Sequence, residues 1–192
     1  MSRNSSPHRH LPLGAAVVVA AALVSGGVAS AGSGSGSSGS SGSRTINVRL
    51  DGYAETPLAL STSGIGTFRI KVDRAAQTID YTLAYDALEG TVTQAHIHFG
   101  AVSQSGGIAT FLCSNLGNGP AGTQPCPAAP SRVSGTLTPA SVLGPAGQGI
   151  AAGEFDELVA AIRAESTYVN VHSSLYPSGE IRSQLVKGHG RG

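Results

Sequence analysis

Three histidines are the side chains of this sequence best suited to chemistry. His96 and His98 flank Ile97, and His172 follows Val171 in a second apolar stretch. Both stretches are predicted to be β-strands, in which successive side chains point to opposite faces. Because the apolar side chains must face the core, we expect all three imidazoles on the outer face of the sheet, within reach of a metal ion.

A site of this composition would hold copper or zinc. Imidazole nitrogen suits both metals, copper(II) has the higher intrinsic affinity, and three protein ligands leave one coordination position open. Binding should weaken as pH falls through the range in which imidazole takes up a proton. The alternative is a set of surface histidines that bind no metal and hydrogen-bond to neighbouring loops. The other histidines, His8, His10 and His189, lie in segments predicted to be removed or unstructured.

Two charged residues could support this site from the last predicted strand. Glu180 and Arg182 share one face of that strand, where they could orient a histidine or attract a small anion. The alternative is a fixed ion pair that closes the preceding turn. No serine-nucleophile motif, phosphate loop or paired-carboxylate motif accompanies them, so the sequence predicts no catalytic residues.

The two cysteines, Cys113 and Cys126, are predicted to form a disulfide. The segment between them is rich in glycine and proline, and an exported chain meets oxidising conditions. Closing a loop of this length stabilises the fold by about 3 kcal/mol in the chain-entropy model. The alternative is that the cysteines join the histidines as metal ligands.

The N-terminal region is typical of an exported protein. Residues 1–31 combine basic residues, a short apolar run and Ala29-Ser30-Ala31, which together predict a signal peptide. Residues 32–43 contain only glycine and serine and are predicted to be a linker. We expect a secreted protein, or one tethered at the cell surface if the segment is not cleaved.

Composition narrows the classes of partner. The net charge is +1 over 192 residues, which gives no electrostatic reason to bind nucleic acid or an anionic membrane surface. Only 12% of residues are charged and 27 are glycine, as in a turn-rich extracellular β-domain. A partner would therefore be an extracellular protein.

The folded region is predicted to be all-β, an antiparallel β-sandwich or Greek-key-like barrel with one short amphipathic helix. Short alternating segments separated by turn residues are typical of such folds. The helix is predicted over 154–164, because Phe155, Leu158, Val159 and Ile162 recur at helical spacing. The predicted strands are Thr45–Leu50, Gly66–Val72, Thr78–Tyr85, Ala95–Phe99, Thr110–Cys113, Arg132–Leu137, Tyr168–His172 and Glu180–Leu185.

Several of these segments together resemble the CHRD domain, named after chordin. They are Ala95–Gly100, Phe155–Arg163, Tyr168–His172, Tyr176–Leu185 and the opening residues Leu50, Gly52, Glu55, Pro57, Gly64 and Gly66. The resemblance covers 44–186, which leaves 187–192 as a disordered tail. Where the family commonly has a glycine, this chain has Ser183, a difference expected to affect packing.

The resemblance implies little about activity. In chordin such domains belong to an extracellular antagonist that binds signalling proteins. A looser likeness is to copper/zinc superoxide dismutase, which also places a His-x-His pair and a later Val-x-Val-His histidine on the outer face of a β-barrel; only the three histidines match. The hypotheses are therefore an exported copper- or zinc-binding domain, a non-catalytic interaction module of the cell surface, and a redox enzyme of the superoxide dismutase kind.

Overall fold

Alternating apolar and polar residues form eight antiparallel strands in the computed structural model, which describes residues 43–187. Each predicted strand is present, most of them one or two residues longer than predicted. The strands are β1 (Arg44–Asp51), β2 (Ile65–Asp73), β3 (Thr78–Asp86), β4 (Val92–Phe99), β5 (Gly107–Ser114), β6 (Ser131–Leu137), β7 (Thr167–Ser173) and β8 (Ile181–Gln184). The predicted signal peptide, most of the linker and most of the tail lie outside the described residues.

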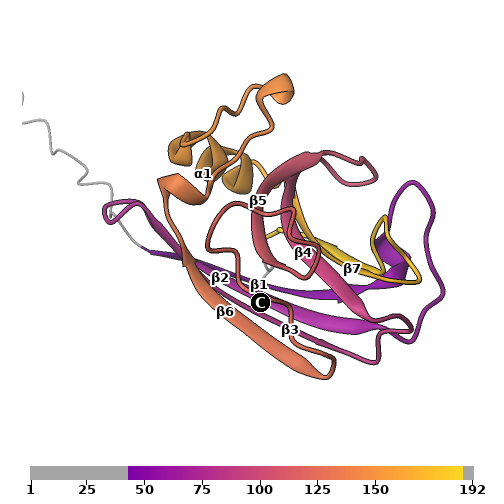
Figure 1. Cartoon of the computed structure of the whole chain (residues 1–192). Helices are drawn as coiled ribbons and strands as arrows, with labels where there is room; N and C mark the ends of the chain where they lie inside the picture. The colour runs from indigo at the N-terminus through magenta and orange to yellow at the C-terminus, as the bar shows by residue number, and fades with distance from the viewer. Residues whose placement is uncertain (1–42, 188–192) are drawn as a thin grey trace, which may run out of the picture. The chain divides into compact units, whose positions relative to one another are not determined.

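The strands form one strongly curved sheet in the order β5-β4-β7-β8-β1-β2-β3-β6 (Figure 1). Its two edge strands approach each other, so the sheet is a nearly closed barrel. The Tyr81 hydroxyl of β3 donates to the carbonyl of Leu112 in β5 across this seam at 2.8 Å. The prediction of an all-β antiparallel fold with one α-helix is confirmed.

The core lies inside the curve of the sheet. In β2 and β3 the alternate residues Phe68, Ile70 and Val72 face inward beside Leu83, Tyr81 and Ile79, and all six are buried. The two strands are joined by a short turn after Asp73. Alternation alone therefore sorted these side chains correctly between core and solvent.

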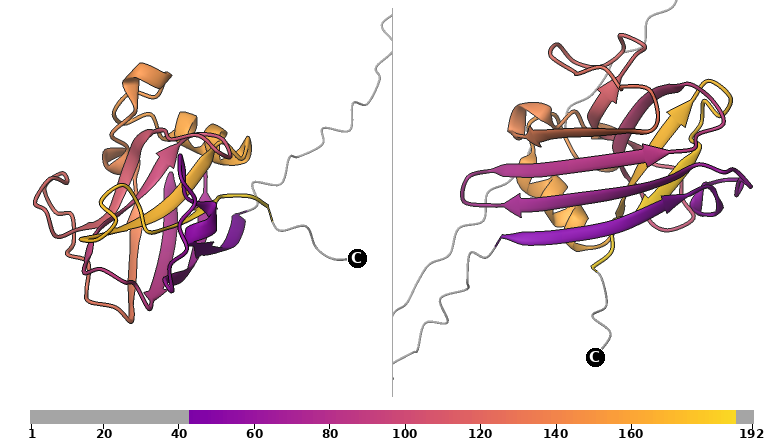
Figure 2. Two further views of the ribbon diagram at one scale, coloured as in Figure 1. Left: turned by 90° about the vertical axis from the view of Figure 1, so that its right-hand side faces the viewer. Right: turned by 90° about the horizontal axis from the view of Figure 1, so that it is seen from below.

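The helix α1 (Phe155–Arg163) packs at one end of the barrel (Figure 2). It buries Phe155, Leu158, Val159 and Ile162, the residues that predicted it. Asp156 in the first turn and Arg163 in the last turn both interact favourably with the helix dipole.

Three short 3-10 helices, Gly52–Ala54, Pro139–Ser141 and Ala146–Gln148, lie in the connections. No helix among residues 43–187 is long and apolar enough to cross a membrane.

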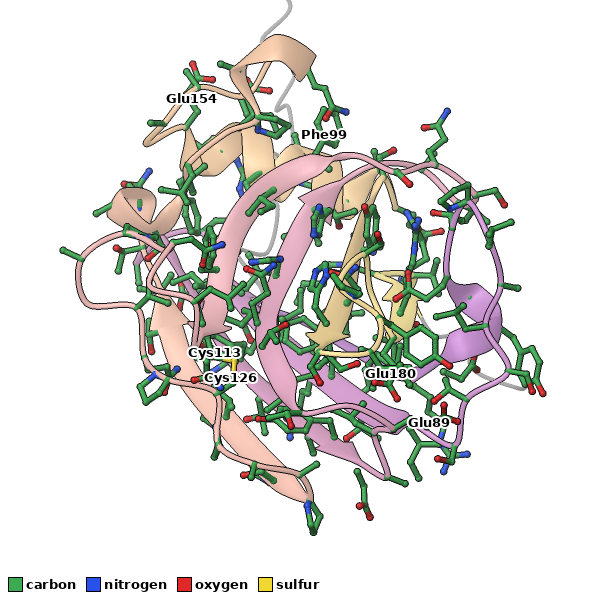
Figure 3. The ribbon with its side chains drawn as sticks, turned by 45° about the vertical axis from the view of Figure 1, so that its right-hand side comes forward. Glu89, Phe99, Cys113, Cys126, Glu154 and Glu180 are labelled. Carbon is green, nitrogen blue, oxygen red and sulfur yellow. A yellow bond between two sulfur atoms is a disulfide. The ribbon has the colours of Figure 1, made fainter. Side chains whose placement is uncertain are left out.

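A disulfide-closed loop bridges the seam of the barrel. Cys113 in β5 is bonded to Cys126, as predicted, and both are buried (Figure 3). Within this loop the Gln124 side chain donates to the Leu112 carbonyl at 3.2 Å and to the Ser134 carbonyl of β6 at 3.1 Å. The alternative role of the cysteines as metal ligands is wrong, because neither thiol is free.

Candidate metal centre

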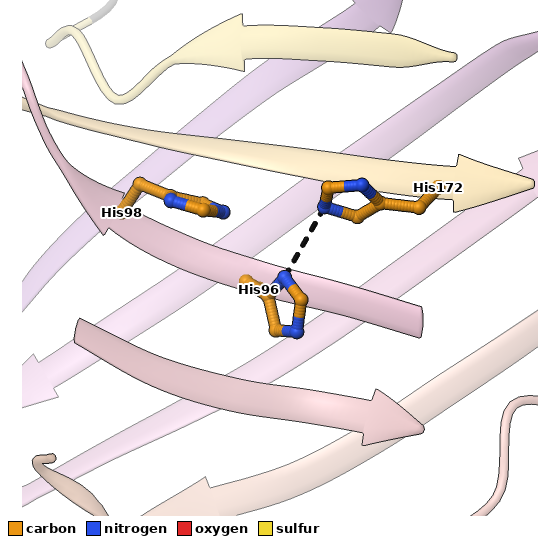
Figure 4. Close-up of side chains that lie close together, drawn as sticks. All are labelled: His96, His98 and His172. Atoms are coloured by element: carbon orange, nitrogen blue, oxygen red, sulfur yellow. Dashed lines mark hydrogen bonds between the residues drawn. The ribbon is translucent and has the colours of Figure 1, made fainter. Parts of the chain in front are cut away.

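The pairing of β4 with β7 brings the three histidines together. The register places Gln94 opposite His172, His96 opposite Asn170 and His98 opposite Tyr168. His172 is therefore the diagonal neighbour of His96 on the same face of the sheet. Figure 4 shows the three imidazoles converging from these two strands. The sequence could not establish that the strands are adjacent.

The histidines lie on the face opposite the core, as predicted, but that face is not open to solvent. The exposed fraction is 0% for His96, 7% for His98 and 6% for His172. Three connections cover this face: residues 52–64 before β2, residues 100–106 before β5 and residues 174–180 before β8. The expectation of exposed imidazoles was wrong, because strand alternation says nothing of the loops that fold back over a sheet.

Hydrogen bonds to two of these connections fix the orientation of two rings. Nδ1 of His98 lies 2.9 Å from the Gly106 carbonyl, and Nδ1 of His172 lies 2.9 Å from the Pro177 carbonyl. A carbonyl oxygen can only accept, so both Nδ1 atoms carry the proton. In the neutral ring each Nε2 then presents a lone pair. Backbone carbonyls commonly hold metal-binding histidines in this way.

The donor atoms are close enough for one ion. One ligand nitrogen from each histidine lies within 4.8 Å of the other two. Nδ1 of His96 is 3.2 Å from Nε2 of His172, the contact drawn in Figure 4. Metal–nitrogen bonds of 2.0–2.1 Å in a tetrahedral site correspond to about 3.3 Å between donor atoms. Small ring movements would therefore allow all three nitrogens to coordinate.

Burial keeps the imidazoles neutral. It lowers the pKa of His98 from 6.5 to about 4, even though the hydrogen bond to Gly106 favours the charged form. It also lowers the pKa of His172, and that of His96 to about 2, where the neighbouring His172 adds to the effect. A metal would therefore compete with protons at a lower pH than the ordinary imidazole range from which the sequence-based expectation was drawn.

Arg182 contacts the site through an aromatic ring. Its guanidinium carbon lies 3.4 Å from the centre of the Tyr168 ring, which in turn stacks on His98 with the ring centres 4.8 Å apart. The guanidinium also donates to Thr56 Oγ1 and to the carbonyls of Ala101 and Gln104, the last at 2.9 Å. Arg182 thus fastens two covering connections over the histidines.

Glu180 points elsewhere. Its Oε1 accepts hydrogen bonds from Thr62 Oγ1 at 2.8 Å and from the Glu89 backbone N–H at 2.6 Å, and Figure 3 shows the two glutamates at the same end of the sheet. No hydrogen bond joins it to a histidine among the described residues. Its predicted alternative, an ion pair with Arg182, is wrong: the only ion pair among residues 43–187 joins Arg74 and Asp156.

Comparison with known families identifies the domain. The CHRD domain family matches residues 46–185, which include all eight strands apart from the first two residues of β1. The chain belongs to the CHRD family. Nothing among curated proteins or among solved structures matched this chain.

Two polar residues of this CHRD domain were not predicted to belong to the site. Asn170 was assigned no role, yet it is 3% exposed and lies on the histidine face. Glu55, one of the residues that carried the family resemblance, is also buried, and burial raises its pKa from 4.5 to about 7 despite the nearby Arg182 guanidinium. The alternation in β7 places Asn170 beside His172, but no sequence signal places Glu55 there.

Proposed function

We propose that this CHRD domain is an exported metal-binding module that holds one copper or zinc ion on His96, His98 and His172. The observation that carries the proposal is the convergence of three buried, neutral imidazoles, two of them oriented by backbone carbonyls. Three nitrogen donors leave a fourth position for another ligand or for water. Copper(II) is expected to bind more tightly than zinc, because it stands higher in the intrinsic affinity order for such ligands.

The free energy of the metal-free arrangement supports the proposal. Nε2 of His96 and Nε2 of His98 are buried and have no hydrogen-bond partner among the described residues. A buried polar atom without a partner costs about 1–3 kcal/mol. A set of purely structural histidines would be expected to satisfy these atoms, whereas a bound ion would use the unpaired lone pair of His98 Nε2.

Export is part of the same proposal. The disulfide between Cys113 and Cys126 is typical of proteins from oxidising compartments. The basic and apolar N-terminal segment followed by Ala29-Ser30-Ala31 is typical of a signal peptide. A metal site in such a protein would take its ion from outside the cytoplasm.

The test is the metal content of protein purified without an affinity tag, followed by titration with copper(II) and zinc(II) against a competing chelator. We expect one ion per chain and a copper(II) affinity above that for zinc. Substoichiometric metal together with no saturable binding would contradict the proposal.

A second candidate function is a protein-interaction module. Its support is a group of exposed apolar side chains on the covering connections: Tyr53, Leu58, Val102 and Leu175, exposed by 72, 75, 67 and 56%. Exposed large apolar side chains on loops can contribute to protein-binding surfaces. An extracellular protein that binds these connections would contact the domain directly above the histidines. Tag-free protein that lacks metal but retains such a partner would favour this second function.

A further inference from the structure

Asn170 lies at the centre of the histidine face. It stands directly opposite His96 of β4 on one side and Arg182 of β8 on the other, and it precedes His172 by two residues in β7. Directly paired residues of an antiparallel sheet have Cβ atoms about 4.5–5.5 Å apart. The Asn170 side chain is therefore a first neighbour of the three imidazoles.

The oxygen of this amide has no partner. Oδ1 of Asn170 is buried and accepts no hydrogen bond from any described residue. The same is true of Nε2 of His98, which carries a lone pair because its Nδ1 proton is held by Gly106. Asn170 is also the diagonal neighbour of His98, because His98 pairs with Tyr168, which lies two residues before Asn170 in β7. Asn170 Oδ1 and His98 Nε2 are therefore two buried acceptors on the same face of the sheet, and neither has a hydrogen-bond donor among the described residues.

Glu55 explains why the oxygen points this way. A Cβ built on Gly179 would lie 2.6 Å from Glu55 Oε1 and 2.8 Å from Asn170 Nδ2, so both atoms border the space kept free by that glycine. A carboxylate accepts hydrogen bonds and an amide nitrogen donates them. Nδ2 is thus the amide atom on the side of Glu55, whose Oε1 accepts no hydrogen bond from a described residue, and Oδ1 is the atom left to face the histidines.

We infer that Asn170 Oδ1 is the fourth protein donor to the ion held by His96, His98 and His172, with Glu55 as the positioning residue behind it. The inference rests on the proposed function. The ion would then have three nitrogen donors and one oxygen donor from the protein, instead of three nitrogen donors and an open position. An amide oxygen is a neutral donor, so the ion keeps its full positive charge among neutral ligands, next to the Arg182 guanidinium. Glu55 supplies a nearby negative charge when it is ionised.

The test compares metal affinity and the visible absorption of the cobalt(II) form, which reports the ligand set directly. Asn170→Ala should lower copper(II) and zinc(II) affinity at least about 10-fold, because a direct donor contributes no less than the supporting groups whose removal costs about 10- to 100-fold. It should also change the cobalt(II) spectrum. Asn170→Asp, which keeps the size and one oxygen and adds a negative charge, should bind more tightly than the unmodified domain and should also shift the cobalt(II) spectrum. Asn47→Ala, at an exposed asparagine of β1, should change neither property.

Glu55 is tested separately as a positioning residue. Glu55→Ala should shift the cobalt(II) spectrum toward that of Asn170→Ala, whereas Glu55→Gln, which keeps an acceptor oxygen, should largely restore it. A merely structural role for Glu55 would lower stability and leave the spectrum of the folded protein unchanged.

The outcomes distinguish the role of Asn170 from the three-histidine site itself. Unchanged affinity and spectrum in Asn170→Ala, with binding lost in His172→Ala, would overturn the role of Asn170 and leave the three-histidine site standing. If Asn170→Ala does not fold, unchanged affinity and spectrum in Asn170→Asp would overturn it equally. Absence of binding in the unmodified domain would overturn the proposed function itself, and the role of Asn170 with it.

Discussion

At the scale of single residues, burial governs the chemistry of this CHRD domain. His96, His98 and His172 are shielded from solvent, so their neutral forms are favoured and their rings are held in place by neighbouring backbone. A solvent-exposed histidine would spend much of its time in other rotamers or, at mildly acidic pH, protonated. Burial leaves ring nitrogens without hydrogen-bond partners, which destabilises the metal-free site. The same burial keeps the rings neutral and oriented, which favours binding of an ion.

The three histidines should act as a unit. Alanine at any one of them should weaken copper(II) binding by more than about 100-fold, since loss of a ligand exceeds the loss of a supporting group. A second alanine should add little, because ligands of one ion are coupled and their effects are not additive. Isothermal titration calorimetry of single and double variants measures this.

The control for this series is His189→Ala, in the tail outside the described residues, which should bind like the unmodified domain. Unchanged affinity in His172→Ala would reduce the site to a two-histidine contact within β4. The interaction module would then become the better account of the function.

Glu55 predicts a pH dependence of stability. Its pKa is about 7 in the folded protein, against 4.5 for the ordinary group, so unfolding releases a proton between these values. The contribution of Glu55 to the free energy of unfolding is fully present below pH 4.5 and is lost as pH rises to about 7. The total change is on the order of 3 kcal/mol. Glu55→Gln, which does not titrate, should therefore gain stability relative to the unmodified domain as pH rises from 5 to 8.

Urea unfolding of the metal-free proteins at several pH values measures this difference. The buried histidines act in the opposite direction: their lowered pKa values remove stability as pH falls below 6.5. They are common to both proteins, so they cancel when the two curves are subtracted. A difference that stays constant from pH 5 to 8 would mean that Glu55 does not titrate in this range.

At the scale of elements, the site depends on strands and connections that come from distant parts of the chain. The pairing of β4 with β7 brings the three histidines together, and Arg182 in β8 ties down the connections after β1 and after β4. The seam of the barrel depends in the same way on the disulfide-closed loop, whose Gln124 bridges β5 and β6.

Removing the disulfide should lower stability without removing the site. The double variant Cys113→Ala/Cys126→Ala should lose about 3 kcal/mol of free energy of unfolding, because the loop is no longer closed in the unfolded chain. Metal affinity should stay close to that of the unmodified domain, since neither sulfur is a ligand. Urea unfolding and metal titration of the same preparation give both quantities.

The pairing itself is checked by alkylation without reductant followed by mass spectrometry of exported protein. We expect no alkylated cysteine. Two alkylated thiols in freshly exported material would contradict the disulfide.

At the scale of the whole molecule, a bound ion should stabilise the fold. An ion that binds only the folded form adds about 2.7 kcal/mol at a free concentration of 100 times Kd. For a domain of this size that corresponds to a rise in Tm of roughly 5–10 °C. Calorimetric melting with zinc(II) should show this rise, and a chelator should reverse it.

The His172→Ala variant supplies the control for that experiment. Its Tm should be nearly independent of zinc(II), because the ion would lose a ligand from β7 and no longer link this strand to β4. An equal rise in the variant and the unmodified domain would place the bound zinc at another site.

The sequence was sufficient to predict the local structure. The eight strands, the inward face of β2 and β3, the helix α1 and the disulfide all follow from patterns within a few residues, because side-chain alternation and helical periodicity are properties of the local backbone. The same local rule correctly placed His96, His98 and His172 on the faces opposite the core.

Only the tertiary structure determined which strands and connections contact those faces. Adjacency of β4 and β7, which lie some seventy residues apart in the chain, depends on the order of strands in the sheet, and the covering connections depend on contacts such as that of Arg182 with Gln104. These long-range contacts turned an expected exposed site into a buried one, lowered the pKa of its imidazoles, and placed Asn170 and Glu55 beside it. Alternation fixes the direction in which a side chain leaves its strand, whereas burial, which controls its charge and its chemistry, is set by segments that are remote in sequence.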